Sequence, residues 1–182
     1  AELTDFAGLV RRLWRGERVV GHKGPLGEFP YLHLAPWLDE RIPLLLCAFG
    51  RRSLDFAGGV FDGVILHTFM SDAAVARAVG LVRRGAEKAG RDPASVKVWS
   101  VLATACDLPE EKNLKYLVAR MATYLQAPGY GELLIDINEW DPALLASFRA
   151  APVVRGMLGA IDSIATFDQL REIRDLIPAE WL

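Results

Sequence analysis

Two short apolar runs joined by a glycine turn and a helix constrain this chain more than any other feature. Residues 42–48 and 63–69 are each almost continuously hydrophobic and are bounded by turn signals. Runs of this length without polar alternation are typical of strands in a parallel sheet that is covered on both faces. Gly50 and a helix-forming segment at 53–58 lie between them, so the stretch predicts a βαβ unit. Residues just past such strands are candidates for ligand binding, because the helix N-termini there point N–H groups outward.

The turn after the first run combines a glycine with two arginines. Gly50 favours a sharp turn from strand to helix with exposed amides, and Arg51 and Arg52 add positive charge at the start of the helix. This combination suits a phosphate or a carboxylate. A plain turn followed by solvated arginines explains the same residues equally well, and the local chemistry alone leaves both interpretations open.

The three histidines divide between the end of the second run and a broken segment before the first. His67, followed by Thr68, ends the second run, where a histidine can donate a hydrogen bond to a bound ring or simply be a buried structural residue. His22 and His33 lie within residues 17–40, a segment rich in glycine and proline. We expect this segment to be a loop packed over a sheet edge, and its histidines to be surface or structural residues.

Helical patterns alternate with strands along the rest of the chain. We expect an amphipathic helix at 4–15, a long helix capped by Ser71 or Asp72, a third strand within 96–105, and a helical remainder. This alternation with short joints predicts an α/β architecture. Further helix starts are indicated by Asp107 with Glu110, by Asp141 before Pro142, and by Thr166 with Gln169. Capping therefore explains these carboxylates better than catalysis does.

Composition sets further limits. With 182 residues, of which 52% are hydrophobic, the chain has the size of one globular domain, 1–182. A net charge of −2 provides no positive electrostatic field that would attract nucleic acid, so we expect no nucleic-acid partner. No apolar run is long enough for a membrane and no signal peptide is evident, so we expect no membrane partner and a cytoplasmic location. Cys47 and Cys106 lie in apolar runs, which predicts reduced core residues and no metal site.

Several short motifs follow one another in a distinctive order. They are residues 13–16 before a Gly-Pro loop, residues 43–50, Leu54, residues 57–58, residues 62–66, and residues 89–93 before the third strand. In this order they resemble the luciferase-like monooxygenase superfamily, and within it the branch of oxidoreductases that uses the deazaflavin coenzyme F420. The resemblance implies a (β/α)8 barrel, hydride transfer between a deazaflavin or flavin and a small organic substrate, and a homodimer.

The resemblance also implies where the cofactor lies. The cofactor, coenzyme F420 or alternatively FMN, would have its phosphate near the turn after the fifth barrel strand, with the end of the sixth strand close to the cofactor or substrate. Phe49 departs from the family pattern, which usually has a small residue before the glycine. The positions that correspond to this site are Ala48, Phe49, Gly50, Arg51, Ser53, His67 and Thr68.

Length limits what the resemblance implies, because a barrel of this kind needs about 250 residues. We expect a partial (β/α)8 barrel, about strands five to seven with their helices, with strands near 42–48, 63–69 and 96–105. The family places proton-transfer residues on earlier strands, so no catalytic acid or base is assigned.

An incomplete barrel also suggests a different class of function. It would expose sheet edges and part of its apolar interior. The alternative is therefore a non-catalytic α/β interaction module that pairs with itself or with a complementary fragment. A small Rossmann-like domain is a weaker option, because the glycine fingerprint is missing from the sequence.

Overall fold

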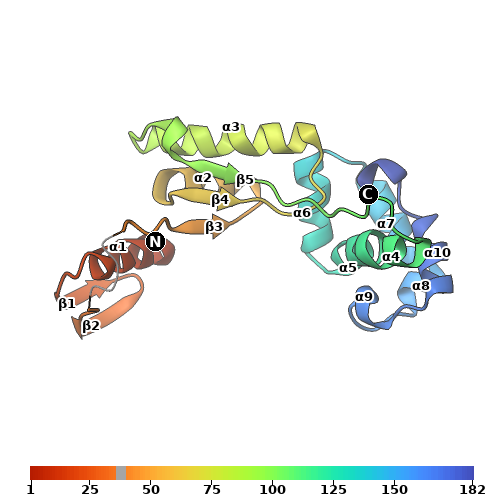
Figure 1. The fold of residues 1–182 in the computed structure, drawn as a ribbon, viewed down its shortest axis with the longest axis horizontal. Helices are drawn as coiled ribbons and strands as arrows, with labels where there is room; N and C mark the ends of the chain where they lie inside the picture. The colour runs from red at the N-terminus through yellow and green to blue at the C-terminus, as the bar shows by residue number, and fades with distance from the viewer. Residues whose placement is uncertain (36–39) are drawn as a thin grey trace.

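The structure, a computed structural model, describes residues 1–35 and 40–182. A helix and a β-hairpin come first, a three-stranded sheet with two helices follows, and a group of helices forms the C-terminal part (Figure 1). The predicted α/β class is confirmed by this mixture of a parallel sheet with helices.

The sheet forms as the apolar runs predict. It has the order β3-β4-β5, and both strand pairs are parallel, with Leu46 opposite Val64 and Val64 opposite Val98. Each strand is shorter than its apolar run, since the ladder pairs only residues 45–47 of the first run with residues 63–65 of the second. The unit consists, in chain order, of β3 (Leu45–Cys47), α2 (Arg51–Val60), β4 (Gly63–Ile65), α3 (Asp72–Lys88) and β5 (Lys97–Trp99).

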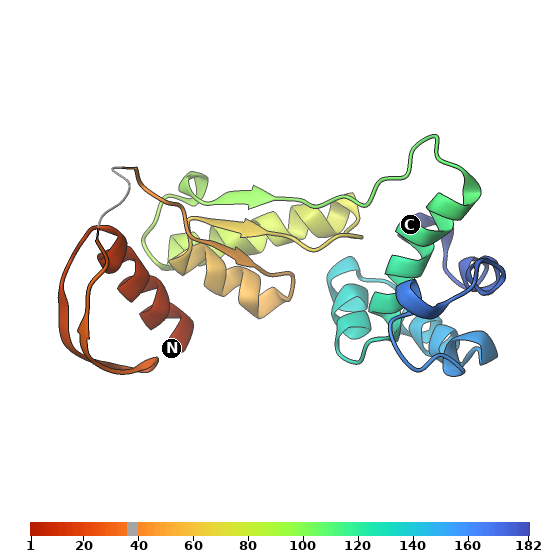
Figure 2. The same cartoon turned by 60° about the horizontal axis from the view of Figure 1, so that its bottom comes forward.

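Residues 1–35 and 40–182 cover only one face of this sheet. Helices α2 and α3 lie against it (Figure 2), and Val64 is fully buried there, with Leu46 and Val98 packed alongside. On the other face, the described residues leave Cys47 exposed and Trp99 59% exposed. The prediction that both faces are covered is therefore wrong. Both crossovers are parallel βαβ connections of the same hand, which puts both helices on the same side.

Both cysteines differ from their prediction. Cys47 lies on the open face of β3 and Cys106 lies in the turn before the next helix, and both are exposed free thiols. The expected burial is wrong because apolar neighbours in sequence do not bury a side chain that the strand turns toward an uncovered face.

Helices α2 and α3 touch through glycines. A Cβ atom added to Gly58 would overlap the backbone carbonyl of Val82, and one added to Gly85 would overlap the carbonyl of Asp55. The two helices therefore approach at backbone distance, which no larger residue would allow at these two positions. Around them, α2 and α3 bury Leu54 and the other apolar residues of a first core cluster.

The N-terminal part corrects a second expectation. After α1 (Glu2–Trp14), strands β1 (Val19–Gly24) and β2 (Gly27–Leu32) form an antiparallel hairpin, not the predicted loop over residues 17–40. Its turn is Pro25 and Leu26, between paired glycines, a turn signal that the many prolines of the segment obscured. Pro36 and Trp37, also expected in that loop, lie outside the described residues.

Asp5 of α1 holds this hairpin. Its Oδ2 atom lies 3.0 Å from His22 Nε2 and accepts a hydrogen bond of 3.0 Å from the N–H of Leu26. The hydrogen bond from Leu26 and the contact with His22 lower the pKa of Asp5 despite its partial desolvation. The structure thus gives His22 a structural role, and His33 is exposed beyond the hairpin.

The C-terminal part is helical and has its own core. Leu125, Phe148 and Ile161 are among its most buried side chains. Its helices are α4 (Glu110–Asn113), a π-helical turn (Leu114–Val118), α5 (Ala119–Gln126), α6 (Tyr130–Asn138), α7 (Pro142–Ala150), α8 (Pro152–Arg155), α9 (Ile161–Ile164) and α10 (Phe167–Arg174). Short 3-10 turns occur at Pro93–Ser95 and Ala179–Trp181.

Most of the predicted helix starts are confirmed. Ser71 caps α3, Asp141 caps α7, and Thr166 forms a capping box with Gln169 at α10. The box predicted for Asp107 and Glu110 is wrong, because Pro109 occupies the cap position of α4. The carboxylate of Glu110 instead pairs with two arginines of α10, Arg171 at 3.2 Å and Arg174 at 3.1 Å.

A buried asparagine joins the two cores. The Asn138 side chain, in a residue only 6% exposed, donates to the carbonyls of Phe69 at 3.1 Å and Leu134 at 3.0 Å, and its Oδ1 accepts from the N–H of Ser71 at 2.8 Å. Phe69 has a φ of 62°, a left-handed conformation that is rare for a bulky residue. Asn138 therefore fixes the loop between β4 and α3 against α6 in a conformation that the loop would not adopt alone.

The glycine contact between α2 and α3 gives a first prediction. We expect Gly85→Ala to lower the free energy of unfolding by about 2 kcal/mol or more. The new methyl group would overlap the backbone carbonyl of Asp55, which cannot move aside without shifting α2. Gly80→Ala, in the same helix with nothing near its Cβ position, should raise it by about 0.5–1 kcal/mol. Urea unfolding measures both, and equal effects of the two substitutions would contradict the packing argument.

Candidate functional site

The sequence-predicted site residues meet at the carboxyl edge of the sheet. Ala48, Phe49 and Gly50 follow β3, and His67 and Thr68 follow β4. The N–H of Ala48 donates to the carbonyl of Ile65 at 3.1 Å, which continues the ladder beyond the strands and keeps the two segments adjacent. The structure therefore brings both predicted groups together, in the place where parallel α/β folds bind ligands.

An aromatic cluster fills this edge. We use this name for Phe49, His67, Phe69, Tyr124 and Tyr130. The His67 ring lies 4.7 Å from Phe49, 4.6 Å from Tyr124 and 5.5 Å from Tyr130, measured between ring centroids. Aromatic rings at such distances pack favourably edge to face or offset. The cluster presents a surface of flat rings beside the ends of two strands.

Sequence reasoning missed Tyr124 and Tyr130. They come from α5 and α6, more than fifty positions after His67, and stack on each other at 5.7 Å. The interruption at Pro128 and Gly129 reverses the chain between the two helices, and Gly129 has a positive φ of 81°. That turn signal was visible in the sequence, but nothing local indicated which rings the turn would face.

His67 is held in one neutral form. Its Nδ1 atom lies 2.8 Å from the carbonyl oxygen of Thr68, and because a carbonyl can only accept, Nδ1 carries the proton. Burial lowers the pKa of His67, and the nearby charge of Arg120 lowers it further, against the opposing effect of the hydrogen bond to Thr68. The Nε2 atom is thus left as a hydrogen-bond acceptor for a ligand N–H or O–H group.

The Gly50 turn differs from its expected geometry. Gly50 has a φ of −74° and a ψ of 145°, values open to any residue, so the prediction that the turn needs glycine for its backbone angles is wrong. A Cβ atom there would lie 3.4 Å from Ser53 Oγ and 3.5 Å from Leu133 Cδ2, which is ordinary to slightly tight packing. The Ser53 hydroxyl donates to the Gly50 carbonyl at 2.8 Å.

The exposed amides of this turn are present as predicted. Among the described residues, none accepts a hydrogen bond from the backbone N–H of Arg51, Arg52 or Ser53 at the start of α2. These are the donors that a helix of ten residues leaves free at its N-terminus, where the helix dipole favours negative charge. An anion can therefore be accommodated here without displacing a protein group.

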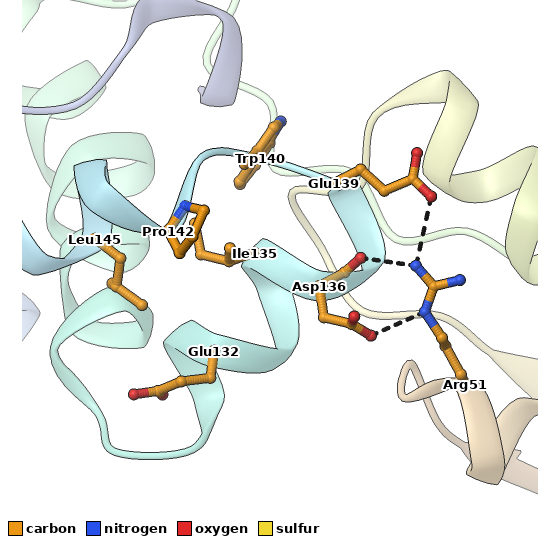
Figure 3. Close-up of a pocket in the computed structure, with 8 residues that line it drawn as sticks. All are labelled: Arg51, Glu132, Ile135, Asp136, Glu139, Trp140, Pro142 and Leu145. Atoms are coloured by element: carbon orange, nitrogen blue, oxygen red, sulfur yellow. Dashed lines mark hydrogen bonds and ion pairs between the residues drawn. The ribbon is translucent and has the colours of Figure 1, made fainter.

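The Arg51 side chain is engaged elsewhere. Its guanidinium contacts Asp136 Oδ2 at 3.0 Å, the Asp136 carbonyl at 3.1 Å and Glu139 Oε1 at 3.5 Å (Figure 3). The hydrogen bond with Asp136 is the main reason that the pKa of Arg51 is raised. Its charge is thus compensated by α6, and the backbone N–H of Arg51 is the part that remains free for a ligand.

A cavity of about 390 Å³ opens beside Arg51 (Figure 3). Its charged lining is mostly acidic: Glu132, Asp136 and Glu139 from α6 and its end, against the single cation Arg51. The Arg149 guanidinium binds Glu132 and lowers the pKa of that carboxyl to about 2. Arg77 pairs with Glu139 at 3.2 Å, so each of the three carboxylates has an arginine partner. The free amides of α2 remain the candidate anion-binding groups of the turn.

Thr68 has an unusual environment. It is only 7% exposed, and its Oγ1 has no hydrogen-bond partner among the described residues. A buried hydroxyl without a partner loses its hydration without compensation. Thr68 also borders a second cavity, of about 490 Å³. Within the ranges 1–35 and 40–182, no group of three or more His, Cys, Asp and Glu side chains could hold a metal ion, and no helix is long and apolar enough to span a bilayer.

The fold is that of an α/β protein whose parallel sheet gathers rings, free amides and an unpaired hydroxyl at its carboxyl edge, the edge at which such sheets bind ligands. The sequence profile of the family described as luciferase-like monooxygenase matches residues 1–172. The chain belongs to this family.

Relatives agree with this assignment. The 5,10-methylenetetrahydromethanopterin reductase of Methanolobus tindarius is 30% identical over 121 residues, which are 66% of this chain and 36% of that protein. The coenzyme F420 dependent tetrahydromethanopterin reductase from Methanopyrus kandleri matches with a TM-score of 0.69 at 16% identity, over 98% of this chain and 47% of that one. An F420-dependent secondary alcohol dehydrogenase in complex with an F420-acetone adduct matches with a TM-score of 0.53 at 16% identity, over 79% and 45%. The chain thus spans less than half the length of each of these three proteins, and the structural matches show its fold.

The lowered pKa of His67 predicts a pH effect on stability. Its folded pKa lies below the reference value of 6.5, so the unfolded state binds the proton first as the pH falls. The free energy of unfolding should therefore decrease as the pH drops through 6.5 toward the folded pKa. His67→Gln should lose this part of the pH dependence, as measured by urea unfolding at pH 7.5 and pH 5.5. His33→Gln, at an exposed histidine, is the control, and identical pH profiles for the wild type and His67→Gln would contradict the prediction.

Proposed function

We propose that the protein is part of an oxidoreductase that transfers a hydride between coenzyme F420 and a small organic substrate, with FMN as the alternative cofactor. The observation that supports this most is the meeting of free amides and an aromatic cluster at one carboxyl edge of a parallel sheet. Family membership and the F420-dependent relatives agree with it. When bound, the deazaflavin supplies the ring that donates or accepts the hydride.

The chain would form about strands five to seven of a (β/α)8 barrel, with their helices. In such a barrel the helices cover the outside, and the other face of the sheet lines the closed interior. The arrangement of α2 and α3 on one face, with Trp99 exposed on the other, agrees with this position. So does the match over 98% of this chain and only 47% of a structural relative.

The residues present fit a cofactor with a phosphate and a planar ring. The N–H groups of Arg51 and Ser53 would bind the phosphate, with Ala48, Phe49 and Gly50 shaping the approach to it. His67 would accept a hydrogen bond at Nε2 from the ring or the substrate, since its Nδ1 is already committed to Thr68. Thr68 would contribute its unpaired hydroxyl to the cofactor or to the substrate. None of the described carboxylates is assigned as acid or base.

The open sheet face supports a second candidate of another class. Cys47 and Trp99 on this face are exposed, which fits a non-catalytic module that pairs with a second copy or with a complementary fragment. A homodimer is part of both proposals. Light scattering over a dilution series measures self-association, and a chain that pairs with itself but binds neither deazaflavin nor FMN would favour this candidate.

Two substitutions of Arg51 test the amide site. Arg51→Ala and Arg51→Pro both remove the guanidinium, but only proline removes the backbone N–H, and proline is tolerated in the first turn of a helix after an extended residue such as Gly50. In a titration with coenzyme F420, we expect Arg51→Ala to bind nearly as well as the wild type, because α6 already holds its side chain. Arg51→Pro should bind about tenfold more weakly, the cost of one charge-assisted hydrogen bond.

The same titration with FMN discriminates between the two cofactors. Circular dichroism should show equal helix content for both variants, which separates lost binding from lost folding. Equal affinities of Arg51→Ala and Arg51→Pro for the cofactor would exclude this N–H as a phosphate donor.

A further inference from the structure

The cavity next to Thr68 lies between two parts of the chain that the proposed cofactor site does not use. One wall is the extended segment 101–104 after β5, and the other is the helix that carries Lys115, Tyr116 and Arg120. Lys115 and Tyr116 belong to the π-helical turn Leu114–Val118. Such a turn inserts an extra residue and redirects side chains, and it occurs often at functional sites.

Within the described structure, the cations at this cavity are not paired with carboxylates. Many of its arginines form ion pairs, yet in the described ranges neither Lys115 nor Arg120 has a carboxylate within 4.0 Å. Arg120 donates only to the hydroxyl of Tyr124, at 3.2 Å. Asp162 also lines the cavity, so two cations and one carboxylate leave one net positive charge. The cavity is thus suited to an anionic group that supplies the missing partner for the cations.

Thr68 adds a neutral donor to the same wall. Its buried Oγ1 lacks a partner among the described residues, and a hydroxyl can donate to a carboxylate or phosphate oxygen. Cations alone could be a solvated surface. Thr68 lines the same cavity, and its buried hydroxyl is a neutral group without a described partner, which a ligand oxygen at this wall could satisfy.

The cavity also adjoins the aromatic cluster. Thr68 follows His67 directly in sequence, and Arg120 reaches Tyr124, whose ring lies 4.6 Å from the His67 ring. A ligand group held by Thr68, Lys115 and Arg120 would therefore place the rest of the ligand next to the rings that the proposed function assigns to the cofactor.

From this geometry we infer that the cavity binds the anionic group, a carboxylate or a phosphate, of the substrate. The term substrate rests on the proposed function, whereas the anion site itself does not. The substrate class that follows is a small organic acid or phosphate ester whose reactive carbon lies beside the aromatic cluster. Lys115 and Arg120 would be specificity-determining residues, with Thr68 orienting the anionic oxygens.

Inorganic phosphate and succinate, titrated into the full chain without cofactor, probe the site directly. We expect the double variant Lys115→Gln, Arg120→Gln to weaken binding of both probes about tenfold or more, because it removes two charge-assisted contacts. The matched control is Lys112→Gln, Arg155→Gln, which makes the same change in charge at exposed residues outside the cavity. The affinity of the control variant for both probes should stay within about twofold of the wild type, because it loses only long-range electrostatic attraction.

Thr68→Val separates binding from stability. Because the hydroxyl makes no hydrogen bond in the described structure, its loss should leave the free energy of unfolding unchanged or raise it, while binding of phosphate weakens about threefold to tenfold. If the charge variants do not fold, amide chemical shifts of the unmodified chain give the same answer. Phosphate should then shift the resonances of Thr68, Lys115 and Arg120. Shifts confined to other residues, or equal weakening by the control pair, would overturn the inference.

Titration with coenzyme F420 then distinguishes substrate from cofactor. The Lys115→Gln, Arg120→Gln variant should keep its cofactor affinity within about twofold, because neither side chain bonds to the Gly50 turn and Arg120 touches the aromatic cluster only through the hydroxyl of Tyr124 among the described residues. A parallel loss of cofactor and phosphate affinity would assign the cavity to an anionic part of the cofactor and refute its assignment to substrate. Phosphate binding at Lys115 without any deazaflavin binding would refute the proposed function and leave the anion site intact.

Discussion

The side chain of Asn138 is the interaction on which the rest of the arrangement depends. It is buried at the end of α6, and it satisfies three backbone groups, two of which belong to the loop after β4. Without these hydrogen bonds, nothing would offset the conformational strain of the positive φ at Phe69. His67 and Thr68 sit immediately before this constrained residue. One buried amide thus fixes the sheet edge, the aromatic cluster and the Thr68 hydroxyl relative to the helical part.

Features that depend on local sequence patterns could be predicted. Two continuous apolar runs separated by a helix indicated parallel strands, and their far ends indicated the place of the site, because side-chain period and turn chemistry are local properties. The caps at Ser71, Asp141 and Thr166 are local for the same reason. Phe49 and His67, which the family resemblance placed at one site, lie side by side because they follow adjacent parallel strands.

Features that depend on distant partners could not be predicted. The carboxylates that bind Arg51 belong to α6 and its end. Two of the rings around His67 belong to α5 and α6, more than fifty residues later in the chain. The exposure of Cys47 depends on which face of the sheet the helices cover, which hydrophobicity alone does not encode. The hairpin was missed because its single turn is hidden among other prolines and glycines.

Charge is distributed between two neighbouring cavities in different ways. Beside Arg51, the three carboxylates are matched by Arg51, Arg77 and Arg149, and Arg51 holds α2 against α6. Beside Thr68, Lys115 and Arg120 outnumber Asp162 and are free of ion pairs with described residues. The cavity beside Thr68 therefore offers unpaired cations to an anion, which the cavity beside Arg51 does not.

The glycine contact between α2 and α3 has a consequence for how this protein can diversify. Two helices interlocked through Gly58 and Gly85 cannot slide or rotate against each other, so the amides at the start of α2 keep a fixed position above the sheet. The segment 101–104, by contrast, is joined to this rigid block at one end only and carries no strand or helix of its own. Changes of length or side chain there would alter the shape of one cavity wall while the block stays intact. The fold thus places the glycine-locked helix pair and the loop-built cavity wall in separate parts of the chain.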